Sequence, residues 1–293
     1  NELIVRGRYA VNLNDDDNSV TQALSGITNA NNCIPFITGI MNNATSQDAD
    51  SGTALAYLEN ATTLRVQKGS NGNNVTVYIV LVEFTGSNWT VLHGDSGNVS
   101  SDTGTITLRN GSDGTGAATN VSSWNDAVIF SHFRGDTSSS GANDAISDLW
   151  PITDPGNNNQ RVDWTFDCNH DSSGSNRHFV HVLVNSDLNV TRFQDNSSSA
   201  GENNINITSA GLSDINQAFI VGSSITRGKG TAYGRGWRNY YLKSTTEAAH
   251  WTHRSGNPMS HDIQIIDLSG LQTSYVGPEI NILGNGNSIP NGN

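Results

Sequence analysis

The sequence predicts an all-β protein made of tandem small antiparallel β-sandwich modules, with an extended strand at the C-terminal end. Short runs of β-branched and other apolar residues recur along the chain, as is typical of strands. Segments rich in Asn, Asp, Ser and Gly separate them, and 30 of the 293 residues are glycine, which suits tight turns. The runs also recur in one order three times, with a period of about ninety residues.

The most apolar strand closes the first repeat. Residues 74–84 read NVTVYIVLVEF, with too many β-branched residues for a helix and apolar side chains on both faces. We therefore expect this strand inside a sheet and not at its edge. The corresponding closing strands are expected at residues 178–185 and 260–268.

The parts that precede the closing strand also correspond. Each repeat opens with an apolar strand, expected at residues 34–39, 127–131 and 218–222. A polar loop leads to a middle strand, expected at residues 62–66, 162–166 and 249–253. Lead-in strands are expected at residues 6–13, 89–93, 105–108, 190–193 and 204–208. We assign the Trp-Thr pairs that begin at Trp164 and Trp251 to one structural position, and residues 19–24 carry the one helical signal, a turn.

The repeats divide the chain into expected domains. Each would have about five or six short strands, enough for a small sandwich with a core of its own. We expect β-sandwich modules at residues 1–88, 89–187 and 188–272, and an extended tail at residues 273–293 that is a candidate donor strand.

This order of elements resembles the H-type lectin module, a six-stranded β-sandwich that usually works as a trimer. The resemblance lies in the apolar opening strand, the middle strand with an aromatic residue and the apolar closing strand, and it covers residues 6–270 as three copies. It implies glycan binding by the modules, and either three linked copies that imitate the trimer or three copies strung like beads. None of that family's sugar-binding residues can be placed on a position of this sequence.

The last residues have a different character. Residues 278–293 read PEINILGNGNSIPNGN and resemble the opening strand of choice-of-anchor and ASH-type immunoglobulin-like repeats of bacterial surface proteins. Either the natural polypeptide continues, or this strand completes the sheet of another subunit by β-augmentation. The candidate subunit contacts in it are Glu279, Ile280, Ile282 and Leu283.

Charge and hydropathy exclude two classes of partner. The net charge of −12 argues against a general nucleic-acid binder, which needs a basic surface. No apolar run reaches the 18 residues or so of a membrane span. The chain begins at Asn1 and not at Met, consistent with a processed, secreted protein, although a sequence cut there for another reason would look the same. We expect an extracellular or cell-surface location.

Two cysteines and one acidic run are candidates for cross-linking and metal binding. Cys33 and Cys168 could form one disulfide or remain two buried thiols, and their spacing matches no zinc site. Asp15, Asp16 and Asp17 could hold calcium, but the run lacks the glycine and distal glutamate of an EF-hand, so a solvated turn is the alternative. No cofactor is expected.

No catalytic constellation can be assembled, and the eight histidines are not expected to gather at one place. His178 and His181 are three residues apart in a strand and so point to opposite faces, as do His250 and His253, which excludes chelation by either pair. The Ser-His-Asp run at residues 260–262 cannot form the hydrogen-bond chain of a triad, because adjacent strand residues alternate faces. The sequence therefore does not indicate an enzyme.

One segment runs against the acidic charge of the chain. Residues 226–243 place cations among aromatic rings, which suits a sugar, a nucleic-acid strand or an anionic protein, while an ordinary Tyr-rich hairpin is the alternative. One hypothesis is that Arg235 and Arg238 receive the acidic run of an adjacent subunit. The other is a glycan site formed by Trp237, Tyr240 and Tyr241.

Glycosylation motifs are frequent but not decisive. An Asn-rich chain of this composition would contain about eight by chance. Asn74 carries one but opens an apolar strand, an unsuitable place for a glycan. The remaining candidates are Asn43, Asn60, Asn88, Asn98, Asn110, Asn120, Asn189, Asn196 and Asn206.

The sequence thus favours a structural subunit of an extracellular filament or surface assembly, which associates with other copies of itself through its terminal strands. The alternative is a lectin-like adhesin whose modules bind surface glycans. A secreted β-sandwich enzyme has little support, because paired carboxylates and an activated nucleophile are both missing from the motifs.

Overall fold

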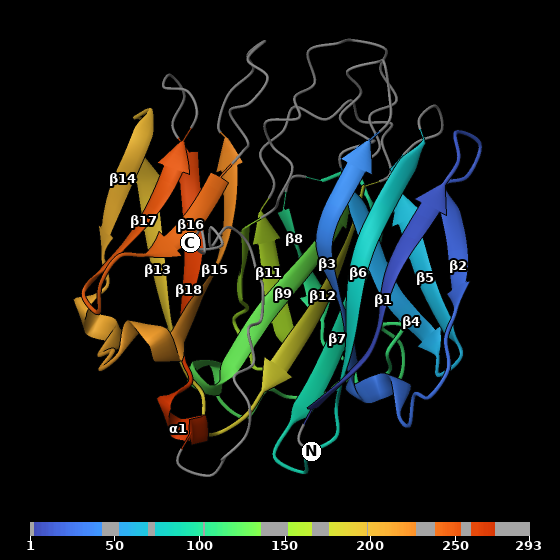
Figure 1. Ribbon diagram of the computed structural model, residues 1–293, viewed down its shortest axis with the longest axis horizontal. Coiled ribbons are helices and arrows are strands. Elements are labelled where there is room, and N and C mark those ends of the chain that lie inside the picture. The colour runs from blue at the N-terminus through green and yellow to red at the C-terminus, as the bar shows by residue number, and fades with distance from the viewer. Residues whose placement is uncertain are drawn as a thin grey trace, which may run out of the picture.

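The computed structural model describes residues 3–42, 53–69, 74–101, 103–135, 152–165, 176–197, 199–226, 238–252 and 259–272. Antiparallel sheets dominate this part of the chain, and its one α-helix is α1 (Ser269–Gln272) (Figure 1). The predicted all-β class is therefore confirmed. The predicted tail at residues 273–293 lies outside the described residues.

One pattern of strand pairing occurs three times, in three groups of six strands that we call strand sets. The first set comprises β1 (Leu3–Leu13), β2 (Ser19–Ala23), β3 (Cys33–Asn42), β4 (Ala54–Asn60), β5 (Thr63–Lys68) and β6 (Val75–Phe84). The second comprises β7 (Thr90–Val99), β8 (Thr103–Thr107), β9 (Ala127–Arg134), β10 (Ile152–Pro155), β11 (Arg161–Thr165) and β12 (Asn176–Val184). The third comprises β13 (Asn189–Ser197), β14 (Gly201–Asn206), β15 (Ala218–Thr226), β16 (Arg238–Leu242), β17 (Glu247–Thr252) and β18 (Met259–Asp267).

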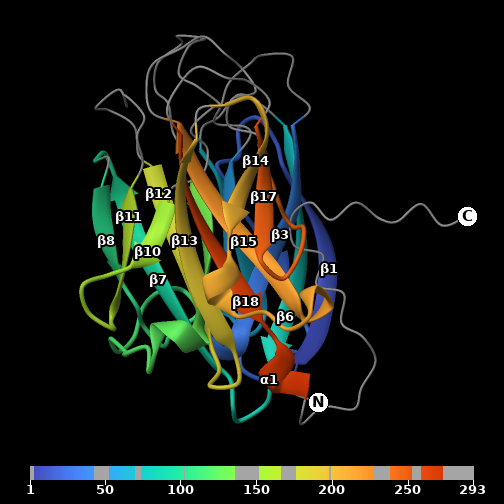
Figure 2. The same ribbon diagram turned by 90° about the vertical axis from the view of Figure 1, so that its left-hand side faces the viewer.

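In every set the sixth strand lies between the first and the third, and the fifth lies between the second and the fourth. We call these the 1-6-3 sheet and the 2-5-4 sheet of a set. They are β1-β6-β3 with β2-β5-β4, β7-β12-β9 with β8-β11-β10, and β13-β18-β15 with β14-β17-β16. The sets stand side by side with their strands roughly aligned, and the third set is in front in Figure 2.

The first two sets share a sheet. A bridge between Ala54 and Phe133 joins β4 to β9, so the 2-5-4 sheet of the first set continues into the 1-6-3 sheet of the second as six strands. The strand sets fall inside the predicted segments 1–88, 89–187 and 188–272. The shared sheet shows that the first two are connected by more than the linking chain.

A capped 3₁₀ turn precedes the third strand of each set. The turns are η1 (Ala30–Asn32), η3 (Trp124–Asp126) and η6 (Ile215–Gln217). Their N-caps Asn29, Ser123 and Asp214 each accept a hydrogen bond from the backbone N–H two residues on, as short polar caps do. A further turn, η5 (Thr208–Ala210), follows β14. The shared caps make Cys33, Ala127 and Ala218 equivalent first residues of β3, β9 and β15.

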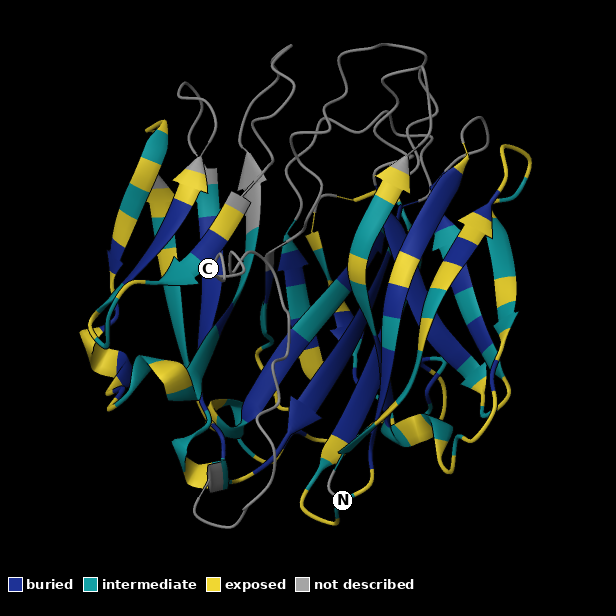
Figure 3. Ribbon diagram, in the orientation of Figure 1, coloured by how far each residue is buried: buried dark blue, intermediate teal, exposed yellow. Residues whose placement is uncertain are grey.

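Each set encloses an apolar cluster between its two sheets (Figure 3). Alternating residues of the sixth strand point into it, such as Val77, Ile79 and Leu81 of β6. Burial of such side chains is the main force that holds paired sheets together. The apolar stretch 74–84 is thus the central strand of its sheet, as predicted.

Two local predictions are wrong. Residues 19–23 form β2 and not a helical turn, because Val20 packs on the core of the first set. The two Trp residues are also not equivalent. The backbone N–H groups of Leu108 and Ile207 bond the carbonyl groups of Gln160 and Thr246, which sets the register of the middle strands. Trp164, 2% exposed, then corresponds to His250, whereas Trp251 is one residue further and 49% exposed.

Candidate association surface

The first and second sets meet where β4 crosses the 1-6-3 sheet of the second set, against β9 and β12. The Ala56 carbonyl oxygen of β4 faces His132 Nδ1 at 3.1 Å and His181 Nε2 at 3.3 Å. One residue further along β4, the Tyr57 ring stacks on Phe179 with centroids 4.8 Å apart. Backbone and side chains of β4 together cover this face, so Phe179 is 0% exposed.

Three histidines gather at this joint. His93 Nδ1 lies 2.9 Å from His181 Nδ1, and His93 Nε2 lies 3.0 Å from the Asn31 carbonyl oxygen. Burial lowers the pKa of His93 and of His132 to about 4, and holds the pKa of His181 well below its usual value. The expectation that the histidines do not gather is wrong, because these three come from the neighbouring strands β7, β9 and β12.

An arginine at the edge of the joint bonds both sets. Arg177 donates to both carboxylate oxygens of Asp95, at 2.8 and 2.6 Å, and to Gln67 Oε1 of the first set at 2.9 Å. Its guanidinium also lies over the Tyr57 ring, 5.4 Å from the centroid. The hydrogen bonds to Asp95 raise the pKa of Arg177, so the cation that spans the two sets stays charged.

The second and third sets meet in an equivalent way. Strand β10 lies against β15 and β18. Asp154 of β10 shares a hydrogen bond with Asp262 of β18, and burial together with this second carboxylate raises the pKa of Asp262 to about 9. Beside them, the Gln264 amide bonds both the N–H and the carbonyl oxygen of Ile129, at 2.9 and 2.8 Å. One carboxylate of the pair is therefore protonated at neutral pH, since two adjacent buried charges would repel.

Apolar side chains connect the two joints. Trp89 and Phe130 belong both to the cluster between the first and second sets and to the cluster between the second and third. Phe36 of β3 meets Phe130 of β9 edge to face, with centroids 5.0 Å apart. The three sets are thus packed around one shared apolar region.

The residues that cover each joint occupy equivalent positions. Tyr57 pairs with the third residue after Thr62, on the middle strand of the first set. In the same way, Asp154 pairs with the third residue after Gln160, and Tyr241 pairs with the third residue after Thr246. In each set, the first residue of the third strand pairs with one residue of the sixth strand. Phe179 and Asp262 each lie five residues before that paired residue in the sequence. Tyr78 has the same position on β6. The series Tyr57–Phe179 and Asp154–Asp262 therefore has Tyr241 and Tyr78 as its third pair.

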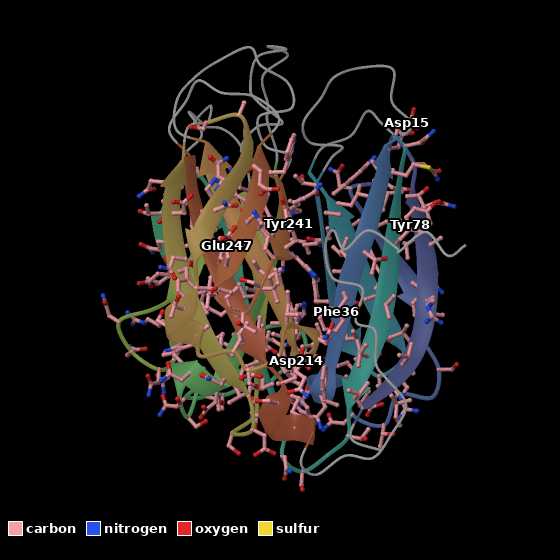
Figure 4. The ribbon with its side chains drawn as sticks, turned by 60° about the vertical axis from the view of Figure 1, so that its left-hand side comes forward. Asp15, Phe36, Tyr78, Asp214, Tyr241 and Glu247 are labelled. Carbon is pink, nitrogen blue, oxygen red and sulfur yellow. The ribbon has the colours of Figure 1, made fainter. Side chains whose placement is uncertain are left out.

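The third pair is not covered. Tyr78 is 40% exposed, whereas its equivalents Phe179 and Asp262 are 0% and 4% exposed. Met41 on β3 is 43% exposed and Val5 on β1 is 47% exposed, both on the same sheet. In Figure 4, Tyr78 and Tyr241 lie on opposite sides of the space between the first and third sets. We call β1-β6-β3 with these three side chains the open face.

The acidic run lies beside the open face, in the turn after β1. Asp15 and Asp16 are exposed there, and the Asp15 N–H bonds Asn74 Oδ1 at 3.0 Å. Burial lowers the pKa of Lys68, while the three carboxylates of the run, Asp17 included, act to raise it. Among the described residues no group of three His, Cys, Asp or Glu side chains is arranged to hold a metal ion.

The aromatic candidates for glycan binding differ in their surroundings. Tyr240 is 4% exposed, and its hydroxyl lies 3.0 Å from His261 Nδ1, so its ring cannot stack on a sugar and that interpretation is wrong. Tyr241 donates its hydroxyl hydrogen to Glu202 on the surface. Trp237 and Arg235 lie outside the described residues, as does the side chain of Arg238, the first residue of β16. The candidate contacts Glu279, Ile280, Ile282 and Leu283 also lie outside them.

The disulfide alternative is wrong for Cys33. Its thiol is free, 0% exposed in the core of the first set, and donates to the Asn29 carbonyl oxygen at 3.4 Å. Burial raises the pKa of Cys33 to about 12, which keeps it unreactive. Cys168 lies outside the described residues.

The described glycosylation candidates are all exposed. In two of them the Asn amide oxygen accepts hydrogen bonds from the Thr of the same motif, as Asn60 does from Thr62 and Asn206 from Thr208. The exposed candidates are Asn60, Asn88, Asn98, Asn110, Asn120, Asn189, Asn196 and Asn206. Asn43 lies outside the described residues, and occupancy by a glycan stays a prediction.

Comparison with known proteins assigns no relative. No family model matches the chain, and no curated protein matches it either. In the part of the chain that the structure describes, no helix has the length and hydropathy needed to cross a membrane.

Proposed function

We propose that the protein is a structural subunit that associates with other copies of itself in an extracellular filament or surface layer. One observation carries the proposal. The open face leaves Tyr78 40% exposed, although the equivalent residues of the other two sets are buried under a neighbouring strand. A sheet face that is covered in two of three equivalent places favours a partner for the third.

The exposed side chains support this reading. Of the described residues, four large hydrophobic side chains are exposed, and Val5, Met41 and Tyr78 of the open face are three of them. Exposed apolar side chains on one face of a sheet suit a protein interaction site. The sheet also continues the apolar contact with the second set, through Val80 and Val82 of β6.

The location and the tail belong to the same proposal. Polar turns, net charge −12 and exposed glycosylation motifs suit a secreted or cell-surface protein. The residues 278–293 supply a second means of association, as an apolar strand added to a neighbour's sheet. Deletion of residues 278–293 would then shorten or abolish polymers without unfolding the three sets.

The test is imaging of the full chain by negative-stain electron microscopy, with sedimentation velocity on the same samples. We expect polymers for the wild type and discrete particles for Tyr78→Asp, because the carboxylate would be buried without a partner at the contact. Asn88→Asp is the matched control, since Asn88 is exposed in the turn between β6 and β7 and lies outside the strands of the open face. A wild type that stays monomeric at high concentration would contradict the proposal.

A lectin-like adhesin is the second candidate, favoured by Trp251. Its ring is 49% exposed on the outer face of β14-β17-β16, with Glu202 and Asn239 paired beside it. An exposed indole between a carboxylate and an amide suits a sugar ring. On a glycan array, binding that is lost in Trp251→Ala and kept in Tyr78→Asp would favour this function.

A further inference from the structure

The two joints inside the chain obey one rule, in which the fourth strand of a set covers the sixth strand of the next. Strand β4 covers β12 through Tyr57 and Phe179. Strand β10 covers β18 through the shared hydrogen bond of Asp154 and Asp262. The chemistry differs, aromatic in one joint and carboxylic in the other, but the positions are the same.

The next step of the rule places β16 on β6. Gln67 lies on β5, two residues beyond the residue that pairs with Tyr57. Its side chain accepts a hydrogen bond from Arg177 across the first joint. The equivalents of Gln67 and Arg177 are Trp251 and Thr76, by the same register that relates the sets. Thr76 pairs with Met41. The contact would thus cover Trp251, Met41 and Tyr78, three of the four large hydrophobic side chains exposed in the described part of the chain.

We infer that Tyr241 of one copy packs against Tyr78 of a second copy, so that the third set of each chain covers the open face of the next. The inference rests on the proposed function and names the two surfaces that meet. Two tyrosine rings at the Tyr57 and Phe179 positions would stack in the same offset way. The contact is heterologous, because the two partners use different surfaces.

The partner is a second copy and not the same chain, because the chain does not close the contact itself. Its third set is fixed to the second by the two hydrogen bonds between Gln264 and Ile129. Its first set is fixed by the contacts of Ala56 with His132 and His181. With both joints made, Tyr78 is still 40% exposed. A heterologous contact that does not close within one molecule propagates into a ring or a helical filament.

The ends of the strands support the same orientation. Arg238 is the first residue of β16 and corresponds to Ala54 of β4, which bridges Phe133 at the end of β9. The position of Phe133 corresponds to Ile40, near the end of β3. The exposed Asp15 and Asp16 follow the end of β1 at that same edge, since the last residues of β1 and β3 both pair with Val75. The first residue of β16 and the acidic turn after β1 would therefore lie at one corner of the contact.

The experiment is cysteine cross-linking between two separately made full-length chains. In a Cys33→Ala, Cys168→Ser background, one chain carries Tyr78→Cys and the other Tyr241→Cys. They are mixed under assembly conditions and treated with a short bis-maleimide. We expect a covalent dimer in the mixture and none from either chain alone. Asn88→Cys mixed with Tyr241→Cys is the matched control and should give no dimer.

A second pair of variants keeps both tyrosines in place. Met41→Cys mixed with Trp251→Cys probes the same contact and should also give a dimer, while circular dichroism checks that each chain is folded. The inference is overturned if the wild type forms polymers but neither pair cross-links between chains. It is also overturned if a double Tyr78→Cys, Tyr241→Cys chain cross-links only within itself. Absence of wild-type polymers would instead count against the proposed function.

Discussion

The Tyr57 ring stacks on the Phe179 ring across the joint between the first and second strand sets, with planes 7° from parallel. This pair shows how one set covers the next, and it is the example within the chain of the contact that we infer between copies. Together with its two equivalents, Asp154 with Asp262 and Tyr241 with Tyr78, it makes three testable cases of one arrangement.

Tyr57→Ala should destabilise the folded chain by about 3 kcal/mol, because it removes a buried ring and leaves Phe179 without its stacking partner. Tyr241→Ala, at the equivalent position but only partly buried and bonded to Glu202 on the surface, should lower the free energy of unfolding by about 1 kcal/mol or less. Urea unfolding of both variants measures the difference. An equal loss of unfolding free energy in both variants would contradict the described difference in burial between the two tyrosines.

Acid should weaken the first joint. His93 and His132 have a pKa of about 4 in the folded chain and about 6.5 when unfolded, so the unfolded chain takes up protons first as the pH falls. The contribution of these two histidines to the free energy of unfolding is complete above pH 6.5. It declines as the pH falls toward 4, by on the order of 3 kcal/mol for each histidine.

His132→Asn keeps a donor for the Ala56 carbonyl oxygen and cannot be protonated. Its unfolding free energy should therefore fall less steeply than that of the wild type between pH 6.5 and pH 4.5. Fluorescence-monitored urea titrations at these two pH values provide the comparison. An unchanged slope would mean that His132 does not contribute to the acid sensitivity.

Alkali should act on the second joint in the opposite direction. The pKa of Asp262 is about 9 in the folded chain, above its ordinary value of 3.8, so the unfolded chain loses the proton first as the pH rises. The contribution of this group to stability is complete below pH 4 and is lost as the pH rises toward 9. Asp262→Asn keeps a hydrogen-bond donor for Asp154 and should be more stable than the wild type at pH 8, by at least about 2 kcal/mol. A destabilised Asp262→Asn at pH 8 would contradict the shared-proton description.

Cys33 should resist thiol reagents until the first set unfolds. The thiol is 0% exposed and its pKa is raised to about 12, so little thiolate is present at neutral pH. Mass spectrometry after iodoacetamide treatment, with and without urea, follows its modification. Rapid labelling of Cys33 in the native protein, or a peptide in which it is bridged to Cys168, would refute the assignment.

The repeating order of strands could be predicted from the sequence because each closing strand is apolar and rich in β-branched residues. The all-β class followed from the same pattern. The capped turns before β3, β9 and β15 could also be aligned, since Asn29, Ser123 and Asp214 are good caps in the same relative place. Residues 19–23 could not be recognised as a strand, because five residues with mixed polarity carry no clear period.

The joints could not be predicted in the same way. The apolar sequence of β4, ALAYLEN, can be recognised, but nothing local shows what the strand packs against. Phe179, on which Tyr57 stacks, is 122 residues away along the chain. Spacing within one strand carries no information on His93, His132 and His181, because these residues meet across three strands. Contacts between repeats depend on how whole sheets pack, which periodicity does not encode.

The most direct test of the central claim is a density map of the native assembly at side-chain resolution. It should show the Tyr78 ring of one copy buried against Tyr241 of its neighbour, with Met41 and Trp251 covered by the same contact. An assembly in which Tyr78 remains exposed to solvent, or is covered by the third strand set of its own chain, would contradict the account.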